Sequence, residues 1–131
     1  MAAALAGVWN VATSDNFEEY MKASGVGFMT RKLAGTVKPV LTITVNGDDI
    51  TINSKSTFKD HTVSFKLGET FDEETIDGRK YKSIFNWTDG KLVQTQTGEN
   101  ASVITRYLKD DHLVIDMDCN GVKATRTYTK A

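Results

Sequence analysis

Turn signals that recur at regular intervals after Pro39 constrain the fold of this chain more than any other feature. Most contain Gly, Asn or Asp, which tolerate the left-handed backbone of tight hairpin turns. They divide the chain into segments of about 8 to 12 residues, a spacing typical of consecutive antiparallel strands. With one strand before Pro39, about ten strands are predicted. The signals are Asn46–Gly47, Lys59–Asp60, Leu67–Gly68, Asp77–Gly78, Asp89–Gly90, residues 98–100, residues 109–111 and Asn120–Gly121.

Closure of this meander is predicted because an open sheet of about ten strands would leave two exposed edges. We therefore expect an all-β fold, a ten-stranded antiparallel up-and-down β-barrel that forms one domain over residues 1–131. A barrel of about eight strands already holds one small ligand, so this one should enclose a larger cavity. Polar Ser83, on the same face as Tyr81, Phe85 and Trp87, agrees with a cavity that holds some ordered water.

Two short helices are predicted between the first strand, residues 7–13, and Pro39. The first covers residues 16–24, with Asp15 or Asn16 as its cap and Gly25 as its stop, and it places apolar side chains one turn apart at Phe17, Tyr20 and Met21. The second covers residues 28–34 and ends at Gly35. Its inner side is expected to carry Val26, Met29, Thr30, Leu33 and Ala34. The pair, at about residues 16–36, is expected to form a helix-turn-helix lid over one end of the barrel.

Composition narrows the class of protein. Lys and Arg total 16 against 17 Asp and Glu, and the isoelectric point near 6.1 argues against general affinity for nucleic acid. Cys119 is the only cysteine, which fits a reducing compartment. Neither a secretory signal nor an apolar run long enough to span a membrane is recognised. We expect a cytoplasmic monomer.

Two arginines lie on faces that the strand period makes apolar. Arg126 alternates with Val122, Ala124 and Tyr128, and Arg106 stands between Ile104 and Leu108. An arginine cannot lose its proton, so an inward-facing one needs an anion, many acceptors or water. The pattern predicts a hollow fold that holds an acidic ligand. An ion pair of Arg126 with Asp77 or Glu74 in a filled core is the structural alternative.

The segment from Gly7 to Tyr20 resembles the signature of the intracellular lipid-binding proteins, the cytosolic fatty-acid-binding family. Further matches follow in order through the chain, in the register of the heart, adipocyte and myelin branch. They include residues 25–27, 30–32, 38–39, 56–59, 64–69, 71–74, 77–80, 90–93 and 125–128. The resemblance implies a ten-stranded β-clam with a helical lid, an internal long-chain fatty acid, and no cofactor.

Carried over by position, the resemblance implies that Arg126 and Tyr128 bind the ligand carboxylate directly and that Arg106 often binds it through water. Retinoic-acid carriers of the same family also use two arginines and a tyrosine, so a retinoid stays an alternative ligand. The short turn at residues 98–101 departs from many relatives. Together with the inward faces of the strands, the resemblance gives as cavity or portal lining Phe17, Tyr20, Met21, Thr30, Pro39, Phe58, Ile76, Asp77, Ile104, Ile115 and Met117.

Basic residues on the predicted lid suggest a second surface. Lys22, Arg31 and Lys32 are candidates for transient contact with anionic membranes, while an ordinary solvated helix face explains them equally well.

An enzyme is the main rival class of function. His61 and His112 stand apart in or near turns, with no carboxylate or cysteine at metal-ligand spacing, and no nucleophile motif surrounds the serines. Cys119 shares a face with Met117, which indicates a buried, inert thiol. No catalytic or metal-binding residue is therefore predicted.

Overall fold

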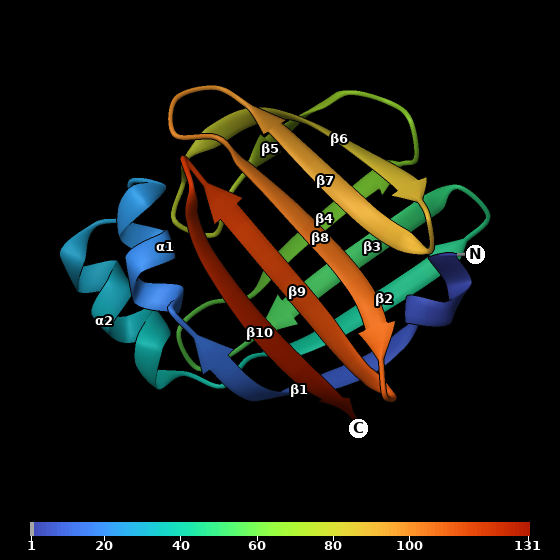
Figure 1. The fold of residues 1–131 in the computed structure, drawn as a ribbon, viewed down its shortest axis with the longest axis horizontal. Coiled ribbons are helices and arrows are strands. Elements are labelled where there is room, and N and C mark those ends of the chain that lie inside the picture. The colour runs from blue at the N-terminus through green and yellow to red at the C-terminus, as the bar shows by residue number, and fades with distance from the viewer. Residues whose placement is uncertain (1) are drawn as a thin grey trace.

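The computed structural model describes residues 2–131. Ten antiparallel strands form one sheet in the order β4-β3-β2-β1-β10-β9-β8-β7-β6-β5, which curls into a barrel (Figure 1). The prediction of a ten-stranded up-and-down barrel is confirmed. The strands are β1 Gly7–Asp15, β2 Val40–Asn46, β3 Asp49–Lys55, β4 His61–Lys66, β5 Phe71–Glu74, β6 Lys80–Thr88, β7 Lys91–Thr97, β8 Ser102–Lys109, β9 His112–Cys119 and β10 Val122–Lys130.

The hairpin turns follow the local chemistry of their residues. Asp89 and Gly90 have φ angles of 51° and 77°, and Asn120 and Gly121 have φ angles of 53° and 86°. Two successive positive φ angles are typical of type I′ turns, whose twist matches that of the flanking strands. These turns fix the register of β6 with β7 and of β9 with β10.

Closure of the barrel is incomplete between β4 and β5, which stand at the two ends of the strand order and share no ladder within residues 2–131. Side chains bridge the two edges instead. The ring nitrogen Nε2 of His61 donates to the Glu74 carbonyl oxygen at 2.8 Å, and Nζ of Lys59 donates to the Ile76 carbonyl oxygen at 3.0 Å. The first bond satisfies an acceptor at the end of the short strand β5, and the second satisfies one in the turn that follows it.

Two helices cover one end of the barrel, at the left of Figure 1. Helix α1 spans Phe17–Ala23 and α2 spans Phe28–Thr36. Asn16 stands at the N-cap of α1, but its side chain donates to the Lys123 carbonyl oxygen at 2.8 Å and not to the helix. The prediction that Gly35 ends the second helix is wrong, because the helix continues one residue further. The Thr36 hydroxyl, which donates to the Leu33 carbonyl oxygen at 2.9 Å, closes this last turn.

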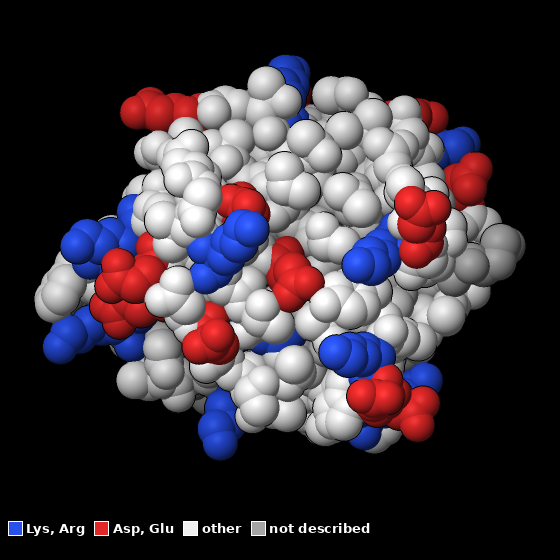
Figure 2. Space-filling model, in the orientation of Figure 1, with Lys and Arg blue, Asp and Glu red and all other residues white. Residues whose placement is uncertain are grey.

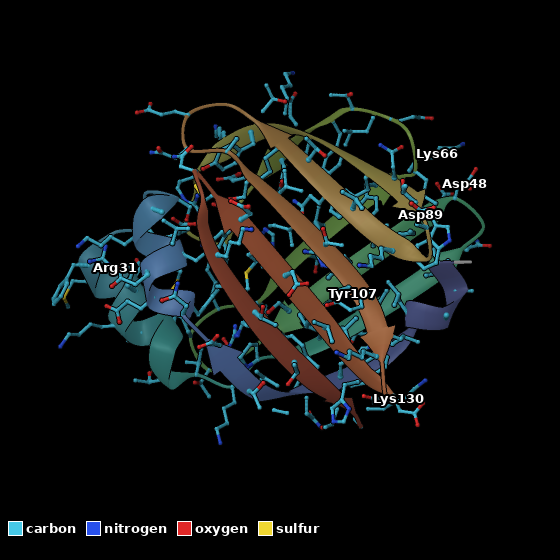
Figure 3. The ribbon with its side chains drawn as sticks, in the orientation of Figure 1. Arg31, Asp48, Lys66, Asp89, Tyr107 and Lys130 are labelled. Carbon is cyan, nitrogen blue, oxygen red and sulfur yellow. The ribbon has the colours of Figure 1, made fainter. Side chains whose placement is uncertain are left out.

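Aromatic side chains fill the opposite end of the barrel. The rings of Phe65 and Phe85 stack with centroids 3.6 Å apart, and Phe71 lies 6.0 Å from Phe85. A 3-10 helix, η1 Ala2–Leu5, packs nearby, and its Leu5 carbonyl oxygen accepts a bond of 3.0 Å from the Trp9 indole. Figure 3 shows Asp48, Lys66 and Asp89 around this end, far from Arg31 of the lid. The packed core thus leaves the lid end available for a cavity.

Among residues 2–131, no helix has both the length and the apolar character needed to cross a membrane.

Candidate functional site

A cavity of about 210 Å³ lies under the lid. It lies between α1, α2, the end of β3, the turn before β6, and β10, so residues far apart in sequence meet around it. Eight of the predicted lining residues and one of the predicted anion-binding residues are there, namely Phe17, Tyr20, Met21, Thr30, Pro39, Phe58, Ile76, Asp77 and Arg126. Val26 and Ala34, predicted on the inner side of the second helix, also line it. The same prediction is wrong for Met29 and Leu33, which are exposed. Residues that sequence reasoning did not name line it as well: Ser24, Val37, Ser54, Ser56 and Arg79.

A second pocket of about 220 Å³ continues from the first towards the middle of the barrel. The two share Tyr20, Ser54, Ile76 and Arg79, and the second one reaches Ile104 and Arg106. Its other walls are partly polar, with Glu73, Gln94 and Gln96 among them. Ile115 and Met117, which the alternation also assigned to the cavity, are buried but line neither pocket. Both belong to the buried apolar cluster of the core.

Arg126 is a cation without a protein counter-ion. Its Nε atom is buried and has no hydrogen-bond partner, and no carboxylate oxygen of residues 2–131 lies within 4.0 Å of its guanidinium. The guanidinium carbon lies 4.3 Å from the centroid of the Phe17 ring and 6.0 Å from that of Tyr128. Cation–π contact satisfies an arginine only partly. The alternative of an ion pair with Asp77 or Glu74 is therefore wrong.

Arg106 is enclosed more completely and has one hydrogen-bonded partner. Its Nη1 donates to Oε1 of Gln94 at 2.9 Å, while its Nε is buried without a partner. Burial lowers the pKa of Arg106, and the nearby Glu73 and the tyrosines Tyr128 and Tyr20 oppose that shift. The guanidinium nonetheless keeps its proton, because the ordinary pKa of arginine is far above neutrality. Arg106 is thus a fixed cation inside the barrel.

Tyr128 lies next to Arg126 on the inner face of β10, and only 3% of its surface is exposed. Burial raises the pKa of its hydroxyl, and the two arginines Arg126 and Arg106 pull it back in part. A tyrosine with a raised pKa is a neutral phenol at pH 7 and can donate a hydrogen bond to an anion. Tyr128 lines neither pocket, but its ring centroid lies 6.0 Å from the guanidinium carbon of Arg126, which does line the first one. A charged donor and a neutral donor therefore lie close together on β10.

An ion pair at the rim of the cavity ties the lid to the barrel. Nε of Arg79 donates to Oδ2 of Asp77 at 2.7 Å, and Nη1 of Arg79 donates to the Ser24 carbonyl oxygen at 2.8 Å. Burial alone would raise the pKa of Asp77, but the bonds from Arg79 and Thr75 outweigh it and lower that pKa below its usual value. Asp77 was predicted to line the portal, whereas Arg79 was missed.

The comparisons with known proteins agree with this geometry. A family model described as the lipocalin / cytosolic fatty-acid binding protein family matches residues 6–131. The chain belongs to this family. It is 48% identical over 126 residues to the adipocyte fatty acid-binding protein of Pygoscelis papua, and the matched region covers 95% of this chain and 96% of the relative.

Solved structures of related proteins superpose closely on this family member. A structure titled REP1-NXSQ fatty acid transporter has a TM-score of 0.97 and 39% identity, covering 99% of this chain and 98% of the other. A Schistosoma mansoni fatty acid binding protein in complex with arachidonic acid has a TM-score of 0.90 and 38% identity, covering 96% and 95%. These names describe binding and transport proteins and no enzyme, in agreement with the prediction that the chain is not an enzyme.

The lid of this fatty-acid-binding family member exposes two of its three candidate membrane-contact residues. Lys22 and Lys32 are exposed. The Arg31 side chain is only 15% exposed, because its Nη1 donates to the Val26 carbonyl oxygen at 2.6 Å and its Nε lies 3.9 Å from Oε1 of Glu18. Figure 2 shows basic and acidic side chains interspersed, with both kinds at the lid end. Arg31 therefore joins the two helices rather than facing solvent.

The two histidines have structural partners. His61 bridges β4 and β5 as described, and Nδ1 of His112 is 2.8 Å from the Asp110 carbonyl oxygen in the β8–β9 turn. Among residues 2–131, no three His, Cys, Asp or Glu side chains form a group that could hold a metal ion. The Cys119 thiol is fully buried and donates to the Asn100 carbonyl oxygen at 3.3 Å.

Proposed function

We propose that this family member binds a long-chain fatty acid inside the barrel and carries it through the cytosol as a monomer. Arg126 and Tyr128 bind the carboxylate directly, and Arg106 acts through water. The observation that carries the proposal is the guanidinium of Arg126, which lines the cavity without a carboxylate partner among residues 2–131. The names of the relatives support a fatty acid as the ligand.

The expected free energies show that the tail and the head group of the ligand contribute differently to binding. Each methylene removed from water contributes about 0.8 kcal/mol, so a tail of about fifteen methylenes contributes about 12 kcal/mol. A charge-assisted hydrogen bond contributes about 1.5 to 3 kcal/mol net, because the free carboxylate is already hydrated. Association costs about 4 to 15 kcal/mol. The tail therefore supplies the affinity, and the arginine selects an acid over a neutral lipid.

Purified protein should bind palmitate more tightly than hexadecanol, which has the same chain length and no charge. We expect a preference of roughly 10- to 150-fold in titration calorimetry, which corresponds to one charge-assisted hydrogen bond. Native mass spectrometry and extraction of the co-purified lipid should identify an acid. Equal affinity for the two compounds would refute the carboxylate site, and much tighter binding of retinoic acid than of palmitate would assign a retinoid carrier.

We also propose that Lys22 and Lys32 bring the lid to anionic membranes when the ligand is transferred. The same helix α2 exposes apolar side chains, with exposed fractions of 57% for Phe28, 72% for Met29 and 47% for Leu33. A cation near an anionic membrane surface contributes about 1 kcal/mol, and apolar side chains can enter the interface. Arg31 is not part of this proposal, because its side chain already binds the Val26 carbonyl oxygen and lies beside the Glu18 carboxylate.

Reversing both charges in Lys22→Glu/Lys32→Glu should slow transfer of a fluorescent fatty acid to anionic vesicles by roughly tenfold or more, since the change removes two favourable contacts of about 1 kcal/mol each. Transfer to neutral vesicles should change little. Lys66→Glu/Lys109→Glu is the matched control, because it changes the net charge equally at exposed sites outside the lid. Equal slowing by both double variants, or transfer that is insensitive to salt, would contradict the proposal.

A further inference from the structure

One buried carboxylate in the barrel has no role in the proposed binding of the ligand. Glu73, on the short strand β5, is only 9% exposed and lines the inner pocket. Its Oε1 accepts three hydrogen bonds, from Oγ of Ser83 at 2.5 Å, Nε2 of Gln94 at 2.8 Å and Nε2 of Gln96 at 3.1 Å. Three neutral donors from β6 and β7 therefore hold this carboxylate in one place.

Gln94 connects Glu73 to Arg106. Its amide nitrogen donates to Glu73, and its amide oxygen accepts from Nη1 of Arg106 at 2.9 Å. The orientation of the amide is fixed by chemistry, because a guanidinium can only donate and an ionised carboxylate can only accept. Gln94 is 2% exposed, so this chain of hydrogen bonds lies in a region of low dielectric, where charges interact strongly.

The two arginines thus differ in their electrostatic surroundings. Arg106 has the Glu73 carboxylate two hydrogen bonds away, whereas no carboxylate of residues 2–131 lies within 4.0 Å of Arg126. The other charged pair at the cavity, Arg79 with Asp77, is internally neutral. The charges facing the two pockets therefore sum to one uncompensated positive charge, located at Arg126.

We infer that Glu73 is a specificity-determining residue, which offsets the charge of Arg106 and restricts the cavity to one singly charged head group at Arg126. The inference rests on the proposed function, since it concerns which acidic lipid the same cavity accepts. A doubly charged head group, such as an alkyl phosphate, would enter a cavity that supplies only one counter-charge. Desolvation of the second charge would then go uncompensated.

Glu73→Gln should raise the affinity for hexadecyl phosphate relative to palmitate by about tenfold, because the interior then carries two uncompensated cations. The substitution keeps the shape of the side chain. Glu74→Gln is the matched control, since it removes the same charge from the adjacent, exposed position of β5. An unchanged ratio in Glu73→Gln, or an equal change in Glu74→Gln, would overturn the inference.

A second experiment tests whether Glu73 offsets the charge of Arg106 by removing the arginine instead of the carboxylate. Arg106→Gln should lower palmitate affinity by roughly tenfold or more, because it removes the water-mediated contact and also leaves the Glu73 carboxylate unpaired beside the ligand. Glu73→Gln/Arg106→Gln should restore the part of the loss that comes from the unpaired carboxylate, and so bind palmitate more tightly than Arg106→Gln. A double variant as weak as Arg106→Gln would overturn the inference. Failure of the wild-type chain to bind palmitate would instead refute the proposed function. In that case, the free energies of unfolding of the ligand-free wild type, the two single variants and the double variant would still show whether Glu73 and Arg106 interact.

Discussion

Arg126→Gln should abolish the preference for palmitate over hexadecanol while leaving hexadecanol binding almost unchanged. Glutamine keeps a neutral donor near the carboxylate but removes the charge that makes its hydrogen bonds strong. Palmitate affinity should fall roughly 10- to 150-fold, which corresponds to about 1.5 to 3 kcal/mol. Hexadecanol gains nothing from the charge, so its affinity depends on tail burial alone. Titration calorimetry with both ligands measures the two affinities.

The same substitution should not destabilise the ligand-free protein. Arg126 carries an uncompensated charge and an unpartnered buried Nε, so its removal takes away a desolvation cost without breaking an ion pair. Unfolding by urea should show equal or higher stability for Arg126→Gln. Lys123→Gln, on the same strand and exposed, removes an equal charge and should alter neither ligand affinity nor selectivity. A large loss of stability with unchanged selectivity would assign Arg126 a structural role.

The strand order could be predicted because turn chemistry is local. Asp89–Gly90 and Asn120–Gly121 adopt positive φ angles that few other residue pairs tolerate, and each such turn makes its two strands neighbours. The unpaired edges of β4 and β5 follow no comparable local rule. Whether two distant strands meet depends on the curvature of the whole sheet, and the bridging bonds of His61 and Lys59 form only once it has closed.

The inward direction of Arg106 and Arg126 could also be predicted, because the strand period of two fixes which face a side chain occupies. Their partners could not. Glu73 lies within an acidic run at residues 72–74, and alternation sets it opposite to both neighbours, but only the fold shows which side chains of β6 and β7 surround its carboxylate. Ser83 was the available signal, since its polar side chain on an apolar face is a donor to Glu73.

The partners of Arg79 could not be predicted from the sequence either. Its partners Asp77 and Tyr81 are close in sequence, but the Ser24 carbonyl oxygen is 55 positions away and becomes an acceptor only because α1 ends beside the β5–β6 turn. Arg31 is the converse case. Its sequence neighbours suggested an exposed basic face, whereas the turn between α1 and α2 brings the Val26 carbonyl oxygen within 2.6 Å of it. In both cases the arginine is held by a carbonyl oxygen whose position relative to it depends on the fold and cannot be predicted from the sequence.

Phe85→Ala should have the largest effect on stability, a loss of about 3 to 5 kcal/mol in the free energy of unfolding. Phe85 is 1% exposed, and its ring stacks on Phe65 and lies 6.0 Å from that of Phe71. The guanidinium carbon of Arg106 is 5.5 Å from the same ring. Truncation therefore removes buried apolar contacts and a cation–π contact together, and the rigid strands around the site limit collapse of the resulting cavity. Urea unfolding monitored by circular dichroism measures the loss.

Phe28→Ala provides the control, because Phe28 is 57% exposed on the lid, where its ring lies beside Arg31 and Lys32. Its loss should stay within about 0.5 kcal/mol. Phe85 lines neither pocket, but its ring contacts Arg106 of the inner pocket, so saturating palmitate should still stabilise Phe85→Ala, by somewhat less than wild type. A loss below about 1 kcal/mol for Phe85→Ala would show that the aromatic cluster does not hold the barrel together. A much smaller gain from palmitate would show that the packed end and the ligand cavity are not independent.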